Sequence, residues 1–176
     1  MCIRDRENQR FMFTYHAGLV ATHPYSSRWW QWLLDLRPIL YYLSYGDGTV
    51  STIGAFVNPL LCWGGLLALP VLAYRAWKCD RTALFILVGY LAQVLPWVFI
   101  SRLTFEYHYF AATLFLVLAL GYVFDRLRRH GYLGIVYAFT AANGVLFALF
   151  YPVLTGVTIP RDYAWNVLKW LPDWPF

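Results

Sequence analysis

Residues Ile53–Tyr74 read IGAFVNPLLCWGGLLALPVLAY and contain no formally charged side chain. An α-helix needs about twenty predominantly apolar residues to cross a bilayer, so this stretch is long enough to span one. Three further apolar stretches follow, at about Thr82–Ile100, at about Tyr109–Phe124 and within Tyr132–Val153, and short charged loops separate them. Since only helices and closed barrels satisfy their backbone hydrogen bonds in lipid, we expect an all-α integral membrane fold with four transmembrane helices.

The composition supports the same class of protein. The chain has 176 residues, of which 60% are hydrophobic, 20% are aromatic and only 13% are charged, whereas a soluble domain carries roughly 25% charged residues. The net charge of +5 does not indicate nucleic-acid binding, because the basic residues lie in short loops beside the apolar spans. We therefore expect membrane lipids, and no nucleic acid, as partners.

The basic residues also indicate how the spans are oriented. The loops Arg75–Arg81 and Asp125–His130 hold six of the fourteen Lys and Arg residues and fall on the same face of a four-span arrangement. The positive-inside rule makes that face cytoplasmic. The segment before the first span, the turn Ser101–Tyr109 and the C-terminal tail are then predicted to be extracytoplasmic.

These expectations divide the chain into four parts. Residues 1–6 (MCIRDR) are charged and lack an apolar core, so they are expected to be a non-native start and not a signal peptide. Residues 7–52 are expected to form an extracytoplasmic interfacial segment, 53–153 the transmembrane region and 154–176 the extracytoplasmic tail. Tryptophans of the tail fit an aromatic belt at the lipid–water interface: Trp165, Trp170 and Trp174.

The richest polar stretch precedes the first span. Its aromatic residues alternate with hydrogen-bonding groups and do not follow an apolar helix face. This pattern fits an interfacial anchor whose arginines meet lipid phosphates, and the alternative is a substrate-facing wall whose arginines bind an anionic group. The candidate donor- or acceptor-binding residues here are His23, Tyr25, Ser27, Arg28, Trp29, Trp30, Trp32 and Arg37.

A second polar cluster closes the second and third spans on the same side and contains Arg102, Glu106, Tyr107, His108 and Tyr109. Arg102 and Glu106 have helical spacing and could form a structural ion pair. Alternatively, Arg102 could hold the phosphate of a lipid-linked donor, because a guanidinium makes two charge-assisted hydrogen bonds to such a group. His108 is either a proton shuttle or a hydrogen-bonded structural residue.

The sequence predicts no metal site, no disulfide and no cofactor. Cys2, Cys62 and Cys79 show neither CxxC nor Cys/His metal spacing. There is also no Gly-rich phosphate loop, no GxSxG turn and no HExxH motif. Acidic residues predicted on the outer side are the candidates for a general base, and none stands in a paired arrangement in the sequence: Asp35, Asp47, Glu106, Asp162 and Asp173.

These residues resemble the protein O-mannosyltransferases, and in particular the C-terminal four-span region of the bacterial members. The resemblance runs from about Phe11 to the end of the chain. It rests above all on HPYSSRWW at 23–30 together with SRLTFEYHY at 101–109. Further matching residues are Tyr15-His16-Ala17-Gly18-Leu19, Arg37-Pro38, Tyr41-Tyr42, Asn58-Pro59, Tyr163 and Trp174-Pro175-Phe176.

The resemblance implies a glycosyltransferase of the bacterial plasma membrane. Such an enzyme takes mannose from a polyprenyl-phosphate donor and transfers it, with inversion, to a Ser or Thr hydroxyl of an exported protein. In the family the base is an aspartate in the first extracytoplasmic loop, upstream of this region, and nothing in this sequence corresponds to it. We therefore expect a fragment that has no catalytic residue of its own, is inactive alone and has the N-terminal catalytic half as a partner.

Two other functions fit the sequence less well. One is a non-enzymatic membrane scaffold or a transporter fragment, although only Gln93 is strongly polar within the apolar spans and no buried charge marks a transport pathway. The other is a lipid-modifying transferase of the same broad architecture that uses a different sugar.

Overall fold

The computed structural model describes residues 2–17 and 22–176, so Gly18 and Leu19 of the sequence resemblance, and Met1, lie outside the described residues. Four helical segments of the described chain are long and apolar enough to cross a membrane. They are α3 (Pro59–Trp77), α4 (Arg81–Val98), the 3-10 turn η1 (Glu106–Tyr109) continued by α5 (Phe110–Arg129), and α6 (Leu133–Thr155). The prediction of four transmembrane helices is confirmed.

The ends of the spans follow from local capping. The side-chain oxygen of Asn58 accepts hydrogen bonds from the backbone N–H groups of Leu60 and Leu61, and Pro59 occupies the first turn, where its missing N–H is tolerated. Asp80 caps α4 in the same way. The first span therefore begins at Pro59, and the predicted start at Ile53 is wrong because Ile53 belongs to a strand.

A small antiparallel sheet precedes the first span, which an all-α fold did not anticipate. The strands β1 (Ile39–Tyr45) and β2 (Thr49–Ala55) form a hairpin, and the short β3 (Ile159–Pro160) of the tail adds to the free edge of β2. The connection Gly46-Asp47-Gly48 is a turn sequence, and Gly48 adopts a positive φ of 67°. The sheet thus ties the N-terminal segment to the C-terminal tail.

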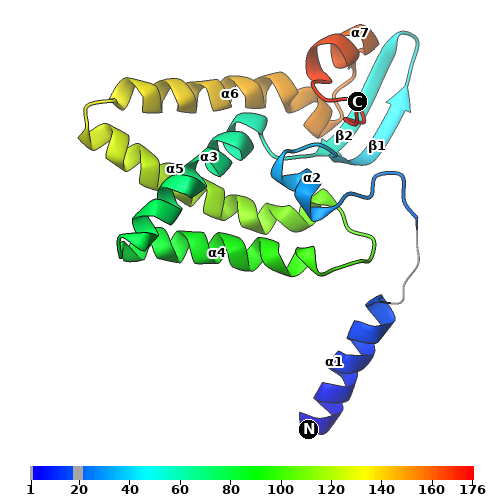
Figure 1. Ribbon diagram of the computed structural model, residues 1–176. Helices are drawn as coiled ribbons and strands as arrows, with labels where there is room; N and C mark the ends of the chain where they lie inside the picture. Colours follow the sequence, from blue (N-terminus) through cyan, green and yellow to red (C-terminus); the bar gives the residue numbers. More distant parts are fainter. Residues whose placement is uncertain (1, 18–21) are drawn as a thin grey trace.

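The helices α3, α4 and α5 pack together as a bundle, whereas α6 lies on the side away from α4 and meets the sheet and the tail at one end (Figure 1). A Cβ atom at Gly65 of α3 would lie 2.7 Å from Cβ of Leu116 in α5, so this glycine permits a close helix contact. The core of the bundle contains Ala68, Leu72, Ala83, Ile86, Ala119 and Leu120.

A second core lies where α6 meets the sheet and the tail, whose short helices are α7 (Arg161–Tyr163) and η2 (Ala164–Leu168). Trp174 packs into this core and is only 1% exposed, so its predicted place in an interfacial belt is wrong. Trp165 and Trp170 are 50% and 40% exposed. Trp174 lies between Phe56, in a tilted contact, and Phe150 of α6, in an edge-on contact, which accounts for its burial.

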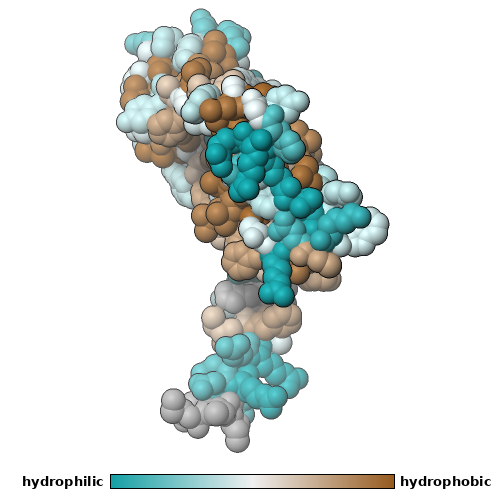
Figure 2. Space-filling view, turned by 90° about the vertical axis from the view of Figure 1, so that its left-hand side faces the viewer, coloured by the Kyte–Doolittle hydropathy of each residue, from teal (hydrophilic) through white to brown (hydrophobic). Residues whose placement is uncertain are grey.

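Short helix α2 (Trp29–Leu33), the hairpin and the tail gather at one end of the spans, and the two basic loops lie at the other (Figure 1). Figure 2 looks onto the basic end and shows hydrophilic surface bordered by hydrophobic flanks. The N-terminal helix α1 (Cys2–Ala17) projects away from the bundle and crosses the expected boundary between residues 6 and 7.

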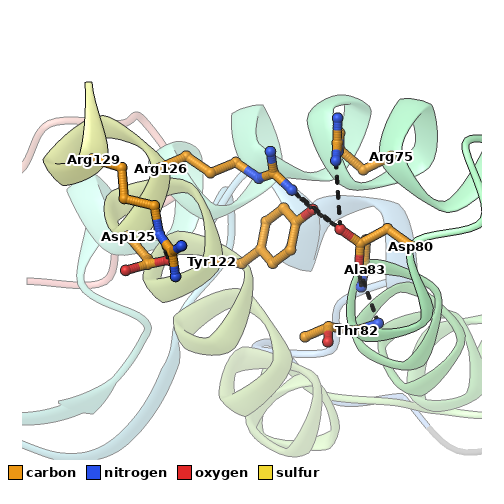
Figure 3. A network of polar contacts seen from close by, with 8 residues as sticks. All are labelled: Arg75, Asp80, Thr82, Ala83, Tyr122, Asp125, Arg126 and Arg129. Carbon is orange, nitrogen blue, oxygen red and sulfur yellow. Dashed lines mark hydrogen bonds and ion pairs between the residues drawn. The ribbon is translucent and has the colours of Figure 1, made fainter.

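Asp80 joins the two basic loops at this end (Figure 3). Its carboxylate accepts hydrogen bonds from the hydroxyl of Tyr122 at 2.6 Å and from Arg126 at 3.1 Å, and Arg75 lies 3.8 Å away. The Tyr122 hydrogen bond is the main reason why the pKa of Asp80 lies below its ordinary value. The loops therefore share one face, as the charge pattern predicted.

Candidate functional site

The two polar clusters singled out in the sequence meet at one pocket. It has a volume of about 710 Å³ and lies between the start of α2 and the chain that follows α4. Its walls are formed by Ser26, Ser27, Arg28, Trp29, Trp30, Gln31 and Arg37 on one side and by Trp97, Val98, Ile100, Ser101, Arg102, Leu103 and Thr104 on the other. We call this the arginine pocket.

Hydrogen bonds fix the first wall of the arginine pocket. The backbone N–H of Arg28 donates to the side-chain oxygen of Gln31 at 2.8 Å, which closes the first turn of α2. The indole N–H of Trp32 donates to Oγ of Ser27 at 2.8 Å. Because Trp32 is buried, it anchors α2 to the bundle and leaves Arg28, Trp29 and Trp30 facing the pocket.

Two hydrogen bonds connect the walls directly. The backbone N–H of Ser27 donates to the carbonyl of Thr104 at 2.9 Å, and the hydroxyl of Thr104 donates to the carbonyl of Ser27 at 2.7 Å. Ser27 and Thr104 are both buried. This reciprocal pair sets the spacing of the walls at one edge of the pocket.

The charge of the pocket is positive. Arg28, Arg37 and Arg102 line it, and no carboxylate is among the described residues that do so. A guanidinium of Arg37 donates to the carbonyl of Pro24 at 2.8 Å, which holds that side chain in place. Three guanidinium groups beside indole and hydroxyl side chains form a site suited to an anionic group such as a phosphate carried on an apolar chain.

Several predicted site residues support the pocket from behind instead of lining it. His108 packs between Trp97 and Trp32, with ring centroids 4.2 Å and 6.0 Å away, and its Nδ1 lies 2.8 Å from the carbonyl of Phe105. The hydroxyls of Tyr109 and Tyr90 pair at 2.9 Å in the interior. His108 and Tyr109 thus have the hydrogen-bonded surroundings of structural residues.

The other predicted residues lie near the edge of this region. His23 packs edge-on against Phe105 at 5.1 Å and accepts a hydrogen bond from the backbone N–H of Tyr25 at 3.2 Å. Tyr107 is 41% exposed and stacks on His108 at 4.3 Å. His23, Tyr25 and Tyr107 therefore shape the surface next to the pocket.

Glu106 does not lie where an ion pair with Arg102 would require it. Its side chain is fully buried and its carboxyl oxygens accept no well-formed hydrogen bond from the described residues, whereas Arg102 lines the pocket. The structure therefore does not support the predicted ion pair between Arg102 and Glu106.

Glu106 instead lies within hydrogen-bonding reach of Asp35, whose side chain is also fully buried. No acidic residues are paired along the sequence, but the fold brings these two together. The pair is formed by tertiary packing between distant segments, so spacing along the chain could not reveal it. The one available signal is that each acid interrupts an apolar or aromatic run, LLDL at 33–36 and FEY at 105–107.

The fold and the pocket define a class: a membrane protein with four spans and a cationic, aromatic pocket at the end opposite its basic loops. A family model for the "C-terminal four TMM region of protein-O-mannosyltransferase" matches residues 6–78 and 71–174. The chain belongs to this family, as the sequence resemblance indicated.

Comparison with curated proteins supports the same family assignment. The polyprenol-phosphate-mannose–protein mannosyltransferase of Mycobacterium tuberculosis is 35% identical over 188 residues, which cover 92% of this chain and 35% of that protein. The protein of the same name from Mycolicibacterium smegmatis is 31% identical over 92% of this chain and 36% of its own length. The chain thus spans about a third of the length of these relatives.

A solved structure shares the fold. The Saccharomyces cerevisiae protein O-mannosyltransferase Pmt1–Pmt2 complex bound to the sugar donor superposes with a TM-score of 0.78 and 22% sequence identity. The match covers 97% of this chain and 26% of the yeast chain. At this identity the likeness establishes the arrangement of spans, sheet and tail.

Proposed function

We propose that this chain forms the donor-phosphate side of a membrane protein O-mannosyltransferase. The observation that carries the proposal is the arginine pocket, in which Arg28, Arg37 and Arg102 converge from two distant segments. The curated relatives are named for polyprenol-phosphate mannose and for protein mannosylation. The donor is then a lipid-linked phosphosugar, the acceptor is a Ser or Thr hydroxyl of an exported protein, and no metal or other cofactor takes part.

The chemistry of such a transfer gives the pocket a defined role. The acceptor oxygen bonds to the anomeric carbon of mannose from the side opposite the phosphate, which inverts that centre, and the bond between carbon and phosphate oxygen breaks. A carboxylate base takes the hydroxyl proton. The departing polyprenyl phosphate gains negative charge, and guanidinium groups placed around it stabilise that charge in the transition state.

The base belongs to the N-terminal half in this proposal. None of the described residues that line the arginine pocket is acidic, and the carboxyls of Asp35 and Glu106 are buried and do not line it. The chain alone would then bind donor without transferring mannose. The N-terminal half of the enzyme would be its partner and supply the base.

The proposal also includes an orientation of the chain in the membrane. The basic loops would face the cytoplasm of a bacterium, and the arginine pocket, α2, the hairpin and the tail would face outward from the plasma membrane. This places the pocket at the outer leaflet, where a lipid-linked donor and an exported acceptor can both reach it.

The test uses the complete enzyme, with the upstream half joined to this chain. Arg102→Ala removes a charge-assisted contact worth about 1.5–3 kcal/mol, which corresponds to roughly a 10- to 100-fold higher apparent KM for polyprenyl-phosphate mannose. Arg129→Ala is the matched control, because Arg129 pairs with Asp125 at the opposite end of the spans. Unchanged donor dependence in Arg102→Ala would remove the assignment.

A further inference from the structure

We propose that Asp35 and Glu106 share one proton in the protein interior, and that this carboxyl pair holds the two walls of the arginine pocket together. The inference goes beyond the proposed function, because it concerns how the pocket keeps its shape whatever anion occupies it. The pair does not line the pocket and is not catalytic; its residues are positioning residues.

The position of the pair supports this role. Asp35 lies two residues after the end of α2, which carries the tryptophans of the first wall and begins just after Arg28. Glu106 opens η1, directly after the segment that carries Arg102 and Thr104 in the second wall. Contact between Asp35 and Glu106 therefore joins the walls from the interior side, as the Ser27–Thr104 hydrogen bonds do at the edge.

The buried surroundings of Asp35 and Glu106 favour a pair in which one carboxyl group keeps its proton. Both side chains are fully buried, and none of the four carboxyl oxygens has a well-formed hydrogen bond from any N–H or O–H of the described residues. Two adjacent buried carboxylates would repel each other and would both lack solvation, so such pairs retain a proton between them. A protonated carboxyl can donate to its neighbour, which satisfies both groups at once.

The groups that face the pair do not supply a compensating positive charge. Among the described residues, the titratable neighbours are Cys62 of α3 and Tyr109 at the end of η1, and Tyr90 of α4 pairs with Tyr109. All three are neutral as thiol or phenol. Burial has the largest effect and raises the pKa of Asp35 from 3.8 to about 6, although hydrogen bonding with Glu106 and, to a smaller extent, with the backbone N–H of Val57 lowers it.

The backbone around Asp35 is held in a fixed conformation, so the carboxyl cannot turn away to solvent without local rearrangement. Asp35 adopts a left-handed φ of 54°, a region that few residues other than Gly, Asn and Asp populate. Its N–H donates to the carbonyl of Trp32 at 3.2 Å, and its own carbonyl accepts from the indole N–H of Trp174 at 2.8 Å. Loss of the shared proton would therefore push α2 and η1 apart and widen the pocket.

The sign of the pH effect follows from linkage. A carboxyl whose pKa is raised in the folded protein binds more protons folded than unfolded, so its stabilising effect is present below the unfolded pKa and is lost as pH rises to the folded value. For Asp35 this window runs from 3.8 to about 6. The chain should therefore lose stability as pH rises through that window.

The test combines infrared spectroscopy with unfolding of the purified chain in lipid nanodiscs. The wild type should show, at neutral pH, the C=O stretching band of a buried protonated carboxyl, which shifts slowly in D₂O. The double variant Asp35→Asn/Glu106→Gln keeps the shape of both groups and should lack the band. The control Asp47→Asn, at the exposed hairpin turn, should retain it.

The unfolding midpoint provides the second readout. It should fall in the wild type and in Asp47→Asn as pH rises between 3.8 and about 6, and the double variant should lack this dependence. A wild type without the band, or a double variant whose midpoint is lowered equally at every pH, would overturn the proposal. The band in the wild type decides the matter even if the variant does not fold, and neither readout involves donor or mannose transfer.

Discussion

The indole Nε1 of Trp174 donates a hydrogen bond of 2.8 Å to the backbone carbonyl of Asp35, 139 residues earlier in the chain. Trp174 is 1% exposed, and Asp35 is buried just after α2, which carries tryptophans that line the arginine pocket. The C-terminal tail is therefore part of the structure that supports the pocket, in addition to any contact that it makes with lipid.

Replacing Trp174 by Phe should remove this hydrogen bond while keeping most of the aromatic packing. Leaving the buried carbonyl of Asp35 unpaired should lower the free energy of unfolding by about 1–3 kcal/mol, measured by denaturant unfolding in detergent. Trp165→Phe, at a half-exposed position of the same tail, should change it by less than about 0.5 kcal/mol. Equal effects of the two variants would contradict the role given to Trp174.

The close contact between α3 and α5 can be tested by the effect of two glycine substitutions on the free energy of unfolding. Gly65→Ala places a Cβ 2.7 Å from that of Leu116, and overpacking of this kind typically lowers the free energy of unfolding by about 1–3 kcal/mol. Gly121→Ala is the control, because a Cβ there meets no atom within 4 Å. The same unfolding measurement should show Gly121→Ala unchanged or slightly more stable, and a neutral Gly65→Ala would show that the helices are less closely packed.

The contribution of Asp80 to stability should depend on pH with the opposite sign to that of Asp35. Its pKa is lowered chiefly by the hydroxyl of Tyr122, so its stabilising effect is present above the ordinary value of 3.8 and is lost as pH falls below it. Asp80→Asn preserves the helix cap but removes the charge, so its unfolding midpoint should lie below that of the wild type at neutral pH. The two midpoints should converge in acid, and a constant difference would count against this account.

The predicted orientation can be tested with Cys79, which is exposed in the basic loop, while Cys62 is buried. In a Cys2→Ser background, an impermeant thiol reagent added to intact cells should leave Cys79 unmodified and should modify it after permeabilisation. Ser44→Cys, placed on the exposed face of β1, should react in intact cells. Labelling of Cys79 from outside would contradict the predicted orientation and would mean that the arginine pocket faces the cytoplasm.

The spans and the two polar clusters could be predicted from the sequence because they depend on local information. Apolar length identifies a span, and the basic loops indicate which ends lie together. The sequence predicts that Arg28 and Arg102 lie on the same side of the membrane. It does not predict that they line one pocket. The family resemblance strengthened this assignment, and the structure places both residues at one pocket.

The remaining features depend on contacts between distant segments. Strands β1 and β2 carry aromatic and β-branched residues that also suit an interface, so their pairing was missed although Gly46-Asp47-Gly48 is a turn signal. The carboxyl pair of Asp35 and Glu106 arises where η1 packs against the α2 region, and Trp174 is buried where the tail packs against α6 and the sheet. Periodicity and spacing carry no information about such contacts.

The central claim is that the arginine pocket holds the phosphate of a lipid-linked mannose donor. The most direct measurement is the Kd of the purified chain for polyprenyl-phosphate mannose in nanodiscs. We expect Arg102→Ala to weaken binding by roughly 10- to 100-fold and Arg129→Ala to leave it unchanged. Equal affinity of the wild type and Arg102→Ala would contradict the claim.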